Sequence, residues 1–176
     1  MKTVMVCLLT LLFVAGPAVS QAVDDKLIVP GVRIGKWTLQ MTIDDLVRMN
    51  GPAQSLDEDD PDFVRRINEF HWQQPGLSLT AITFDRHRVD VLLLNAAPIG
   101  ATVYRTDRGI GFLSTQQDVL RLYGQPTIAR AARMLGMMNM IYDRFGINFQ
   151  VDNRNNGLVA LVAIFRPTSA KTIWKF

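Results

Sequence analysis

The chain has 176 residues, of which 48% are hydrophobic and 20% are charged, and its formal net charge is +3. This length suits one ordinary domain or two small ones, and the hydrophobic share is enough for a packed core. The 19 basic residues are scattered among 16 acidic ones, whereas a nucleic-acid surface needs basic residues clustered on one face. We therefore expect no nucleic-acid partner.

The first 22 residues have the layout of a secretory signal peptide. Lys2 precedes an apolar run that ends at Gly16-Pro17, and small residues follow at Ala18, Ser20 and Ala22. The run is shorter than the about 20 apolar residues of a membrane-spanning helix. Cleavage after Ser20 or after Ala22 fits the small-residue rule; we predict cleavage after Ala22 and a periplasmic or secreted protein. Membrane contact is then expected at most through an uncleaved N-terminal segment or through a partner.

Cys7 is the only cysteine, and it lies inside the predicted signal peptide. The mature chain would therefore have no disulfide, no thiolate nucleophile and no cysteine metal site. The residue before Cys7 is not the small residue that a lipoprotein site requires, so we expect no lipid anchor.

One helix signal occurs twice, at an offset of 73 residues. Residues 39–51 read LQMTIDDLVRMNG, and residues 112–124 read FLSTQQDVLRLYG. Thr42 and Thr115 are predicted N-caps, because a threonine hydroxyl can accept a hydrogen bond from a first-turn N–H group. Each segment ends in a glycine that suits a left-handed backbone, and a proline follows. The pattern predicts short helices over 42–50 and 115–123.

A second block recurs at an offset of 70 residues. Residues 72–81 and 142–151 each begin with an aromatic residue, turn at a glycine and continue as an alternating apolar and polar strand. Turns at 85–88 and 153–157 precede last strands over 89–94 and 158–165. Each unit therefore reads as a helix followed by a meander of three or four antiparallel strands.

These matches predict an α+β fold of two tandem repeats, each a short helix or helix pair on an antiparallel three- to four-stranded sheet. The first repeat covers 29–95 and the second covers 104–167. A connector over 96–103 joins them, and a C-terminal tail over 168–176 follows. We expect each copy to close its own apolar side.

Strand alternation assigns the faces of the expected sheet, because successive side chains point to opposite sides. The helix-facing positions are apolar: Phe70, Trp72, Leu77, Leu79, Ala81, Met140, Tyr142, Ile147, Phe149 and Val151. The opposite face carries Glu69, His71, Ser78, Thr80, Asn139, Ile141, Asn148 and Gln150. We predict that this largely polar face docks another protein of the cell envelope, with a merely solvated face as the alternative.

The acidic run over 57–62 has no counterpart in the second repeat. It lacks the glycine and the terminal glutamate of a twelve-residue calcium loop, so a solvated mobile loop is the expected structure. Because the copies diverge here, Asp57, Asp59 and Asp60 are further candidates for partner contacts.

Groups that could carry catalysis are scarce. His71 and His87 are the two histidines, and the sequence has no hydrolase elbow, zinc-protease motif or three-glycine dinucleotide loop. We therefore expect a non-enzymatic protein without cofactor or metal. The alternative is a periplasmic small-ligand or copper-binding protein, since thioethers are soft ligands. Its ligands would be Met134, Met137, Met138 and Met140, for which core packing is the competing role.

The capped helix ending in glycine and proline, followed by an aromatic residue, a glycine turn and a meander, resembles a known unit. This unit is shared by the β-lactamase inhibitory proteins and the BamE/SmpA outer-membrane assembly lipoproteins, and the likeness covers most of the mature chain. The tandem arrangement is more similar to the inhibitory proteins, and the resemblance implies two units that present a concave sheet to a partner protein. The inhibitory proteins carry disulfides and the BamE-type proteins are lipidated, whereas neither feature is expected here. The resemblance implies an accessory subunit of an envelope complex or an inhibitor-like binder.

Overall fold

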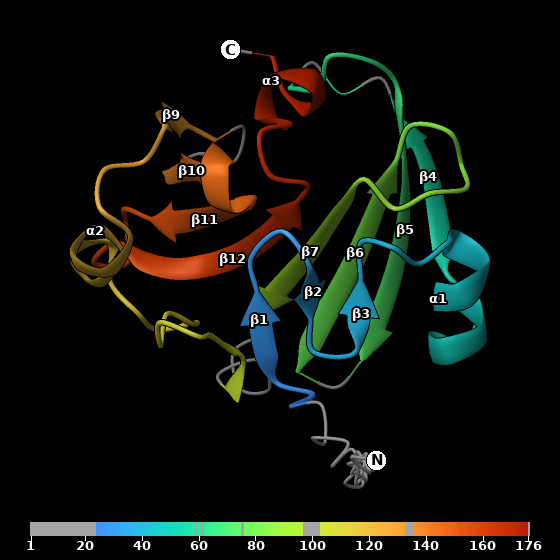
Figure 1. The fold of residues 1–176 in the computed structure, drawn as a ribbon, viewed down its shortest axis with the longest axis horizontal. Coiled ribbons are helices and arrows are strands. Elements are labelled where there is room, and N and C mark those ends of the chain that lie inside the picture. Colours follow the sequence, from blue (N-terminus) through green and yellow to red (C-terminus); the bar gives the residue numbers. More distant parts are fainter. Residues whose placement is uncertain are drawn as a thin grey trace, which may run out of the picture.

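The computed structural model describes residues 24–58, 60, 62–74, 76–96, 103–132 and 136–175. The predicted signal peptide over 1–22 lies outside the described residues, as do residues 97–102 of the predicted connector. The described strands form a long sheet of eight strands and a small sheet of four (Figure 1). Together with the helices they make a mixed α+β fold with an antiparallel long sheet, as the sequence predicts.

The long sheet has the strand order β4-β5-β6-β7-β12-β11-β10-β9, and every neighbouring pair is antiparallel. Its strands are β4 (Gln54–Glu58), β5 (Ile67–Gln74), β6 (Leu77–Thr83), β7 (Val91–Ala96), β9 (Ile128–Ala131), β10 (Met137–Tyr142), β11 (Ile147–Asp152) and β12 (Leu158–Phe165). The small sheet has the order β3-β2-β1-β8, with β1 (Leu27–Val29), β2 (Arg33–Ile34), β3 (Trp37–Thr38) and β8 (Arg105–Thr106). The helices are α1 (Ile43–Asn50), α2 (Gln116–Tyr123) and α3 (Ala170–Ile173), and a short 3₁₀ helix, η2, covers Asp143–Phe145.

Helices α1 and α2 lie where the sequence predicts them, and both begin with the same capping box. The Thr42 hydroxyl accepts a hydrogen bond from the Asp45 N–H at 3.1 Å, and the Asp45 carboxylate accepts one from the Thr42 N–H at 2.9 Å. Thr115 and Asp118 repeat these two bonds at 3.1 and 3.0 Å. Each box satisfies first-turn N–H groups that would otherwise have no intrahelical partner.

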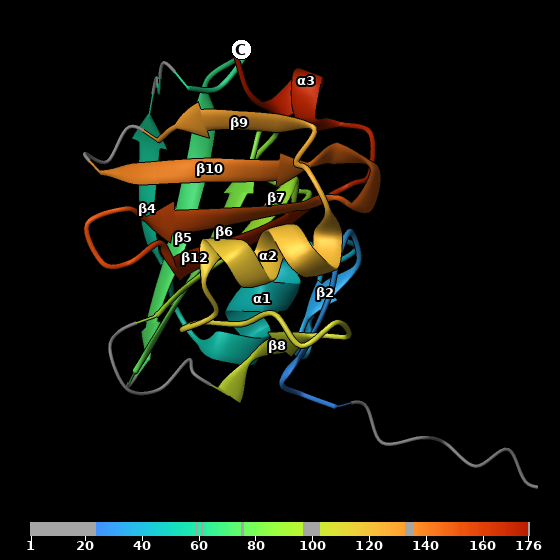
Figure 2. The same ribbon diagram turned by 90° about the vertical axis from the view of Figure 1, so that its left-hand side faces the viewer.

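The other ends of α1 and α2 are also held alike. The Trp72 indole N–H donates to the carbonyl of Gly51 at 2.9 Å, and the Tyr142 hydroxyl donates to the carbonyl of Gly124 at 2.8 Å. Each aromatic residue comes from the second strand after its helix, which is β5 for α1 and β10 for α2. Figure 2 shows the two helices on the same side of the long sheet.

The two four-stranded meanders meet at a seam between β7 and β12. Outward from this seam, one meander runs β7, β6, β5 and β4, and the other runs β12, β11, β10 and β9. Leu94 pairs with Val162 across the seam. The expectation that each copy closes its own apolar side is wrong, because hydrogen bonding at the seam makes one sheet with one main core on its helix side. This core contains all ten positions predicted to face the helices, nine of them buried and Phe70 half-buried at its edge.

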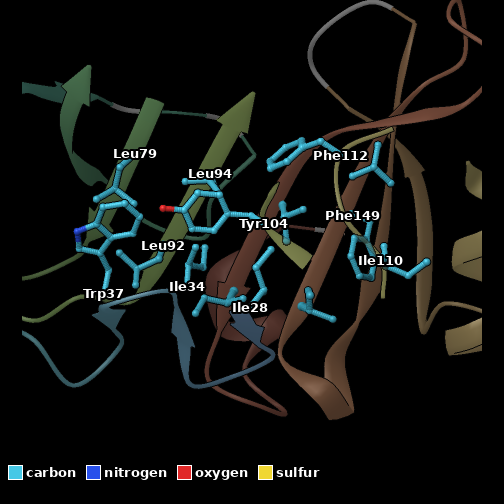
Figure 3. Close-up of a cluster of buried hydrophobic side chains, with 14 of the residues drawn as sticks. Ile28, Ile34, Trp37, Leu79, Leu92, Leu94, Tyr104, Ile110, Phe112 and Phe149 are labelled. Atoms are coloured by element: carbon cyan, nitrogen blue, oxygen red, sulfur yellow. The ribbon is translucent and has the colours of Figure 1, made fainter. Parts of the chain in front are cut away.

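The small sheet completes the main core over the seam. Ile28, Ile34 and Trp37 pack toward Leu92 and Leu94 of β7 (Figure 3). Strand β1 pairs antiparallel with β2 but parallel with β8, which comes after the connector. Residues from both predicted repeats therefore build the small sheet, although the sequence pattern showed no strand in them.

A second core lies on the opposite side of the long sheet, beneath α3. Phe165 of β12, Ile67 of β5 and Ile141 of β10 pack there with Ile173 and Trp174. The region predicted as a C-terminal tail is thus a helix that covers part of the sheet. This departs from the expectation of a free polar face, because Ala170, Ile173 and Trp174 pack against apolar residues at one end of that face.

Candidate functional site

The strand residues predicted to dock a partner lie on one face of the long sheet, the open face, opposite α1 and α2. Cross-strand pairing places all of them except Glu69, which pairs with Ile82, in two adjacent rows. One row runs His71, Thr80, Leu93, Ala163 and Asn148. The next row runs Ser78, Asn95, Leu161, Gln150, Asn139 and Arg130. The sheet therefore brings candidate residues of both predicted repeats onto one continuous surface.

The centre of the open face is apolar, and not polar as the sequence analysis expected. Its floor consists of Ile82, Val91, Leu93, Leu161 and Ala163. The reason lies in the seam strands, because β7 and β12 are apolar on both faces while the outer strands alternate. A continuous apolar strand is typical of a position that is covered on both sides, and Leu93 and Leu161 are only half-buried.

Three amide side chains form one wall of this floor. Asn148 Nδ2 donates to Asn139 Oδ1 at 2.9 Å, and Gln150 Nε2 donates to the same oxygen at 3.3 Å. Asn148 and Asn139 are only 5% and 7% exposed. Among the described residues, Asn148 Oδ1 has no hydrogen-bond donor. A buried polar atom without a partner costs free energy, so this wall offers an acceptor to an incoming N–H group.

The opposite wall belongs to β5 and β6. Glu69 Oε2 lies 3.0 Å from His71 Nε2, and His71 Nδ1 lies 2.9 Å from the Thr80 hydroxyl oxygen. This carboxylate, imidazole and hydroxyl chain has the order of groups found in nucleophilic catalysis. However, β6 pairs with β5 on one side and with β7 on the other. Its N–H groups near Thr80 therefore donate hydrogen bonds within the sheet and are not available to stabilise an oxyanion. The Glu69 carboxylate, whose side chain is 18% exposed, lies close to the imidazole, but its contact with Nε2 does not have hydrogen-bond geometry.

A clasp closes one end of the open face; it consists of residues 62–64 and 173–175. The Lys175 N–H donates to the Asp62 carbonyl at 2.9 Å, and the Val64 N–H donates to the Ile173 carbonyl at 3.0 Å. Arg130 of edge strand β9 lies 3.6 Å from the Asp62 carboxylate and donates to the Lys175 carbonyl at 2.8 Å. The clasp therefore joins the loop after β4 to the far edge of the sheet.

Floor, walls and clasp enclose a half-open pocket of about 480 Å³. Glu69, Asn139, Asn148, Gln150 and Asp60 line it, which places five of the ten predicted docking residues in one pocket. His71, Ser78 and Thr80 lie on the same face beside the pocket. The volume falls within the usual range of binding pockets, roughly 300 to 1,000 Å³.

The other predicted residues lie elsewhere. Asp57 belongs to edge strand β4, where its backbone pairs with Asn68, so the expected mobile loop is wrong for residues 57 and 58. Asp59 and Met134 lie outside the described residues. Met140 is buried in the main core and Met138 packs against it, whereas Met137 follows an alternating strand and points to the other face. The strand thus separates the methionines that copper binding would need together.

The sequence analysis missed the floor, the clasp and Arg130. Two runs could have revealed the floor, because residues 91–94 and 158–165 are apolar without alternation. Trp174 and Phe63 line the pocket and pair across the clasp, with ring centroids 6.2 Å apart. No local pattern points to Arg130, whose partners are distant in the sequence.

Within the described part of the chain, no group of three or more histidine, cysteine, aspartate or glutamate side chains is placed to hold a metal ion. The helices that the structure describes are all too short or too polar to span a membrane.

No family model matches the chain, and no curated protein matches its sequence. Among solved structures, the chain is similar to YfeY from Escherichia coli, with 11% identity and a TM-score of 0.53 over 78% of this chain and 99% of that one. A DUF4309 family protein (YjgB) from Bacillus subtilis has 11% identity and a TM-score of 0.49 over 77% and 82%. A cysteine-rich secretory protein from Staphylococcus aureus has 12% identity and a TM-score of 0.46 over 81% of this chain and 49% of that one. The chain therefore shares its fold with YfeY.

Proposed function

We propose that this protein is a non-catalytic, exported interaction module that docks another protein through the pocket on its open face. The observation that carries the proposal is the apolar floor at the seam, which the clasp and α3 leave accessible between two polar walls. An accessible apolar patch framed by polar groups is typical of an interaction site. Amide and carboxylate side chains at the rim supply the directional bonds that set orientation.

The shape of the pocket favours an extended segment of a partner protein over a compact small ligand. Glu69 on β5 and Asn148 on β11 both line it, and these strands are four positions apart in the sheet. Four inter-strand spacings of about 4.8 Å amount to at most about 19 Å, the length of about six extended residues. The occupant is therefore a short extended stretch of chain lying across the seam.

We also infer that the fold consists of two tandem copies of one helix and meander unit. The two capping boxes, the aromatic donors Trp72 and Tyr142, and the mirrored strand order all support this inference. A further match is that the first N–H of each helix donates to a carbonyl in the turn that precedes the last strand of its unit, from Ile43 to His87 at 2.9 Å and from Gln116 to Gly157 at 2.8 Å. The same features are the grounds for our hypothesis that the chain resembles the β-lactamase inhibitory proteins and the BamE/SmpA lipoproteins.

Export to the periplasm or beyond follows from the signal-peptide pattern of residues 1–22. The mature fold then works without disulfides, since Cys7 is the only cysteine. Its large shared core is consistent with stability in an oxidising compartment without covalent cross-links. Export and a docking pocket together support an accessory role in an envelope complex.

Site-specific photo-cross-linking in the native cells tests the docking proposal. A photoreactive residue at Gln150, on the pocket rim, is compared with one at Gln117, which is exposed on α2. We expect Gln150 to yield a discrete cross-linked protein that Gln117 does not yield. The substitution Leu161→Lys on the floor should abolish this product, whereas Leu122→Lys, on the exposed side of α2, should leave it unchanged.

Both lysine variants must retain the far-ultraviolet spectrum and cooperative unfolding of the wild type. If folded Leu161→Lys protein keeps the Gln150 product, or if both probe positions give the same products, the pocket is not the docking site.

A further inference from the structure

The charged side chains that line the pocket are already engaged within the protein. In the described lining they are Asp60, Asp62, Glu69 and Arg130. Asp60 Oδ1 accepts from the Asp62 N–H at 2.8 Å, and the Asp62 carboxylate lies 3.6 Å from Arg130. Asp60, Glu69 and Arg130 each have a partner elsewhere in the protein as well. A charged group that enters the pocket would therefore lose hydration without meeting an unpaired counter-charge in the described lining.

The amide wall, by contrast, has hydrogen-bonding capacity that the protein does not use. Asn148 is 5% exposed, it lines the pocket, and its Oδ1 has no donor among the described residues. Gln150 Nε2 carries two N–H groups, and among the described residues this atom donates to one acceptor, Asn139 Oδ1. Asn148 Nδ2 donates to the same oxygen at 2.9 Å. Two side chains held by one shared oxygen therefore offer an acceptor and a donor to the pocket.

A peptide group matches this pair of side chains. Each residue of a main chain carries one N–H donor and one carbonyl acceptor, whereas an ammonium group only donates and a carboxylate only accepts. Beside the amide wall, Leu93 pairs with Ala163 across the seam, and Leu161 lies in the next row of the apolar floor. Apolar side chains gain free energy by covering such a floor, and a buried acceptor without a partner gains from an incoming donor.

We propose that the docked segment is uncharged where it faces the protein: an extended apolar stretch of partner chain, one peptide group of which is bound by the amide wall. Its apolar side chains cover the floor, its N–H donates to Asn148 Oδ1, and its carbonyl accepts from Gln150 Nε2. This inference rests on the proposed docking function and specifies its partner. Side chains of either sign are disfavoured over the floor, so the formal net charge of +3 does not select the partner.

Three synthetic peptides test the preference for uncharged side chains on the purified protein. The parent has six residues with blocked ends, in which leucine alternates with serine, and in the other two the middle leucine is replaced by lysine or by glutamate. Binding is followed by heteronuclear NMR through the side-chain amide signals of Asn148 and Gln150 and the indole N–H signal of Trp174. We expect the parent to shift these signals, and the lysine and glutamate peptides each to bind at least about tenfold more weakly.

An ester scan of the parent peptide tests the bond to the amide wall. Replacing one main-chain N–H at a time by an ester oxygen removes a donor and keeps every side chain. One position should weaken binding to the wild-type protein by about fivefold, the usual worth of a hydrogen bond. The same ester should cost nothing in Asn148→Val, followed through the Trp174 signal, but should keep its full cost in Asn155→Ala, an exposed turn residue outside the pocket. The scan on the wild-type protein stands without either variant.

The outcomes separate this inference from the docking proposal. If the lysine or the glutamate peptide binds as tightly as the parent, or if no ester weakens binding, the inference is overturned, while shifts confined to the pocket leave docking of an extended segment in place. If no peptide shifts the pocket signals while a probe at Gln150 still cross-links its partner, the inference is again overturned and the docking proposal stands. Loss of both results overturns both.

Discussion

Arg130 and Asp62 form an ion pair across the open face, with a nitrogen to oxygen distance of 3.6 Å. Arg130 belongs to β9, one edge of the long sheet, and Asp62 follows β4, the other edge. The contact therefore joins the two ends of an eight-stranded sheet over the same side that holds the pocket. Both side chains are partly buried, at 23% and 33% exposure.

The first prediction concerns this clasp. Asp62→Asn should lower the free energy of unfolding by no more than about 1 kcal/mol, because a partly exposed ion pair contributes little to global stability. Its local effect should be larger. Amide hydrogen exchange at Val64 and Lys175, whose N–H groups bond across the clasp, should accelerate several-fold relative to the main core. Unchanged exchange at both amides would contradict a role for the ion pair in closing the clasp.

The second prediction compares the two helix caps. Thr42→Ala and Thr115→Ala should each reduce the free energy of unfolding by about 1 kcal/mol, the usual loss for a threonine N-cap. The two losses should be similar because the capping boxes have matching bonds. Urea unfolding measures both, and Thr→Ser at each site is the control that keeps the hydroxyl. A loss at one cap only would argue against equivalent helices.

The third prediction concerns acid stability at Asp85. Its Oδ1 accepts from the backbone N–H groups of Arg88 and His87 at 2.7 and 2.8 Å, and these bonds lower the pKa of Asp85 to about 2. A carboxyl group whose pKa is lower in the folded state stabilises the fold above its unfolded pKa, and this contribution is lost as pH falls through the folded value. The loss at Asp85 should therefore occur between about pH 4 and pH 2.

Urea midpoints measured across this interval check the assignment. Asp85→Asn should decline less steeply from pH 4 to pH 2 than the wild type does. Some decline should remain, since the capping hydrogen bonds also lower the pKa values of Asp45 and Asp118. Asp107→Asn is the matched control and should follow the wild-type curve. Parallel curves for Asp85→Asn and wild type would remove Asp85 as a contributor.

Local features of this fold could be predicted from the sequence. Thr42 and Thr115 were identified as caps because a capping box joins residues only three positions apart. The core-facing strand positions, such as Leu79 and Phe149, followed from alternation alone. The amide wall was also found in this way, since Asn139, Asn148 and Gln150 occupy the alternate positions of paired strands.

Features that depend on distant pairing could not be predicted. The seam places Leu93 against Ala163, and only that contact turns two separate apolar strands into a pocket floor. The clasp depends on Asp62 reaching Arg130, and neither residue has a neighbour in sequence that indicates the other. The expected division into two closed units failed for the same reason, because strand alternation does not say which edges will join.

The parallel pairing of β1 with β8 has a consequence for how the chain folds. Leu27 pairs with Arg105, so residues made early in synthesis find their partner only after the first meander has left the ribosome. Contacts between such distant residues form slowly, because a long loop must be closed first. Ile28 and Ile34 can pack against Leu92 and Leu94 of β7 once the first meander has formed, but the outer edge of β1 gains its partner only when residues 105–106 have been made.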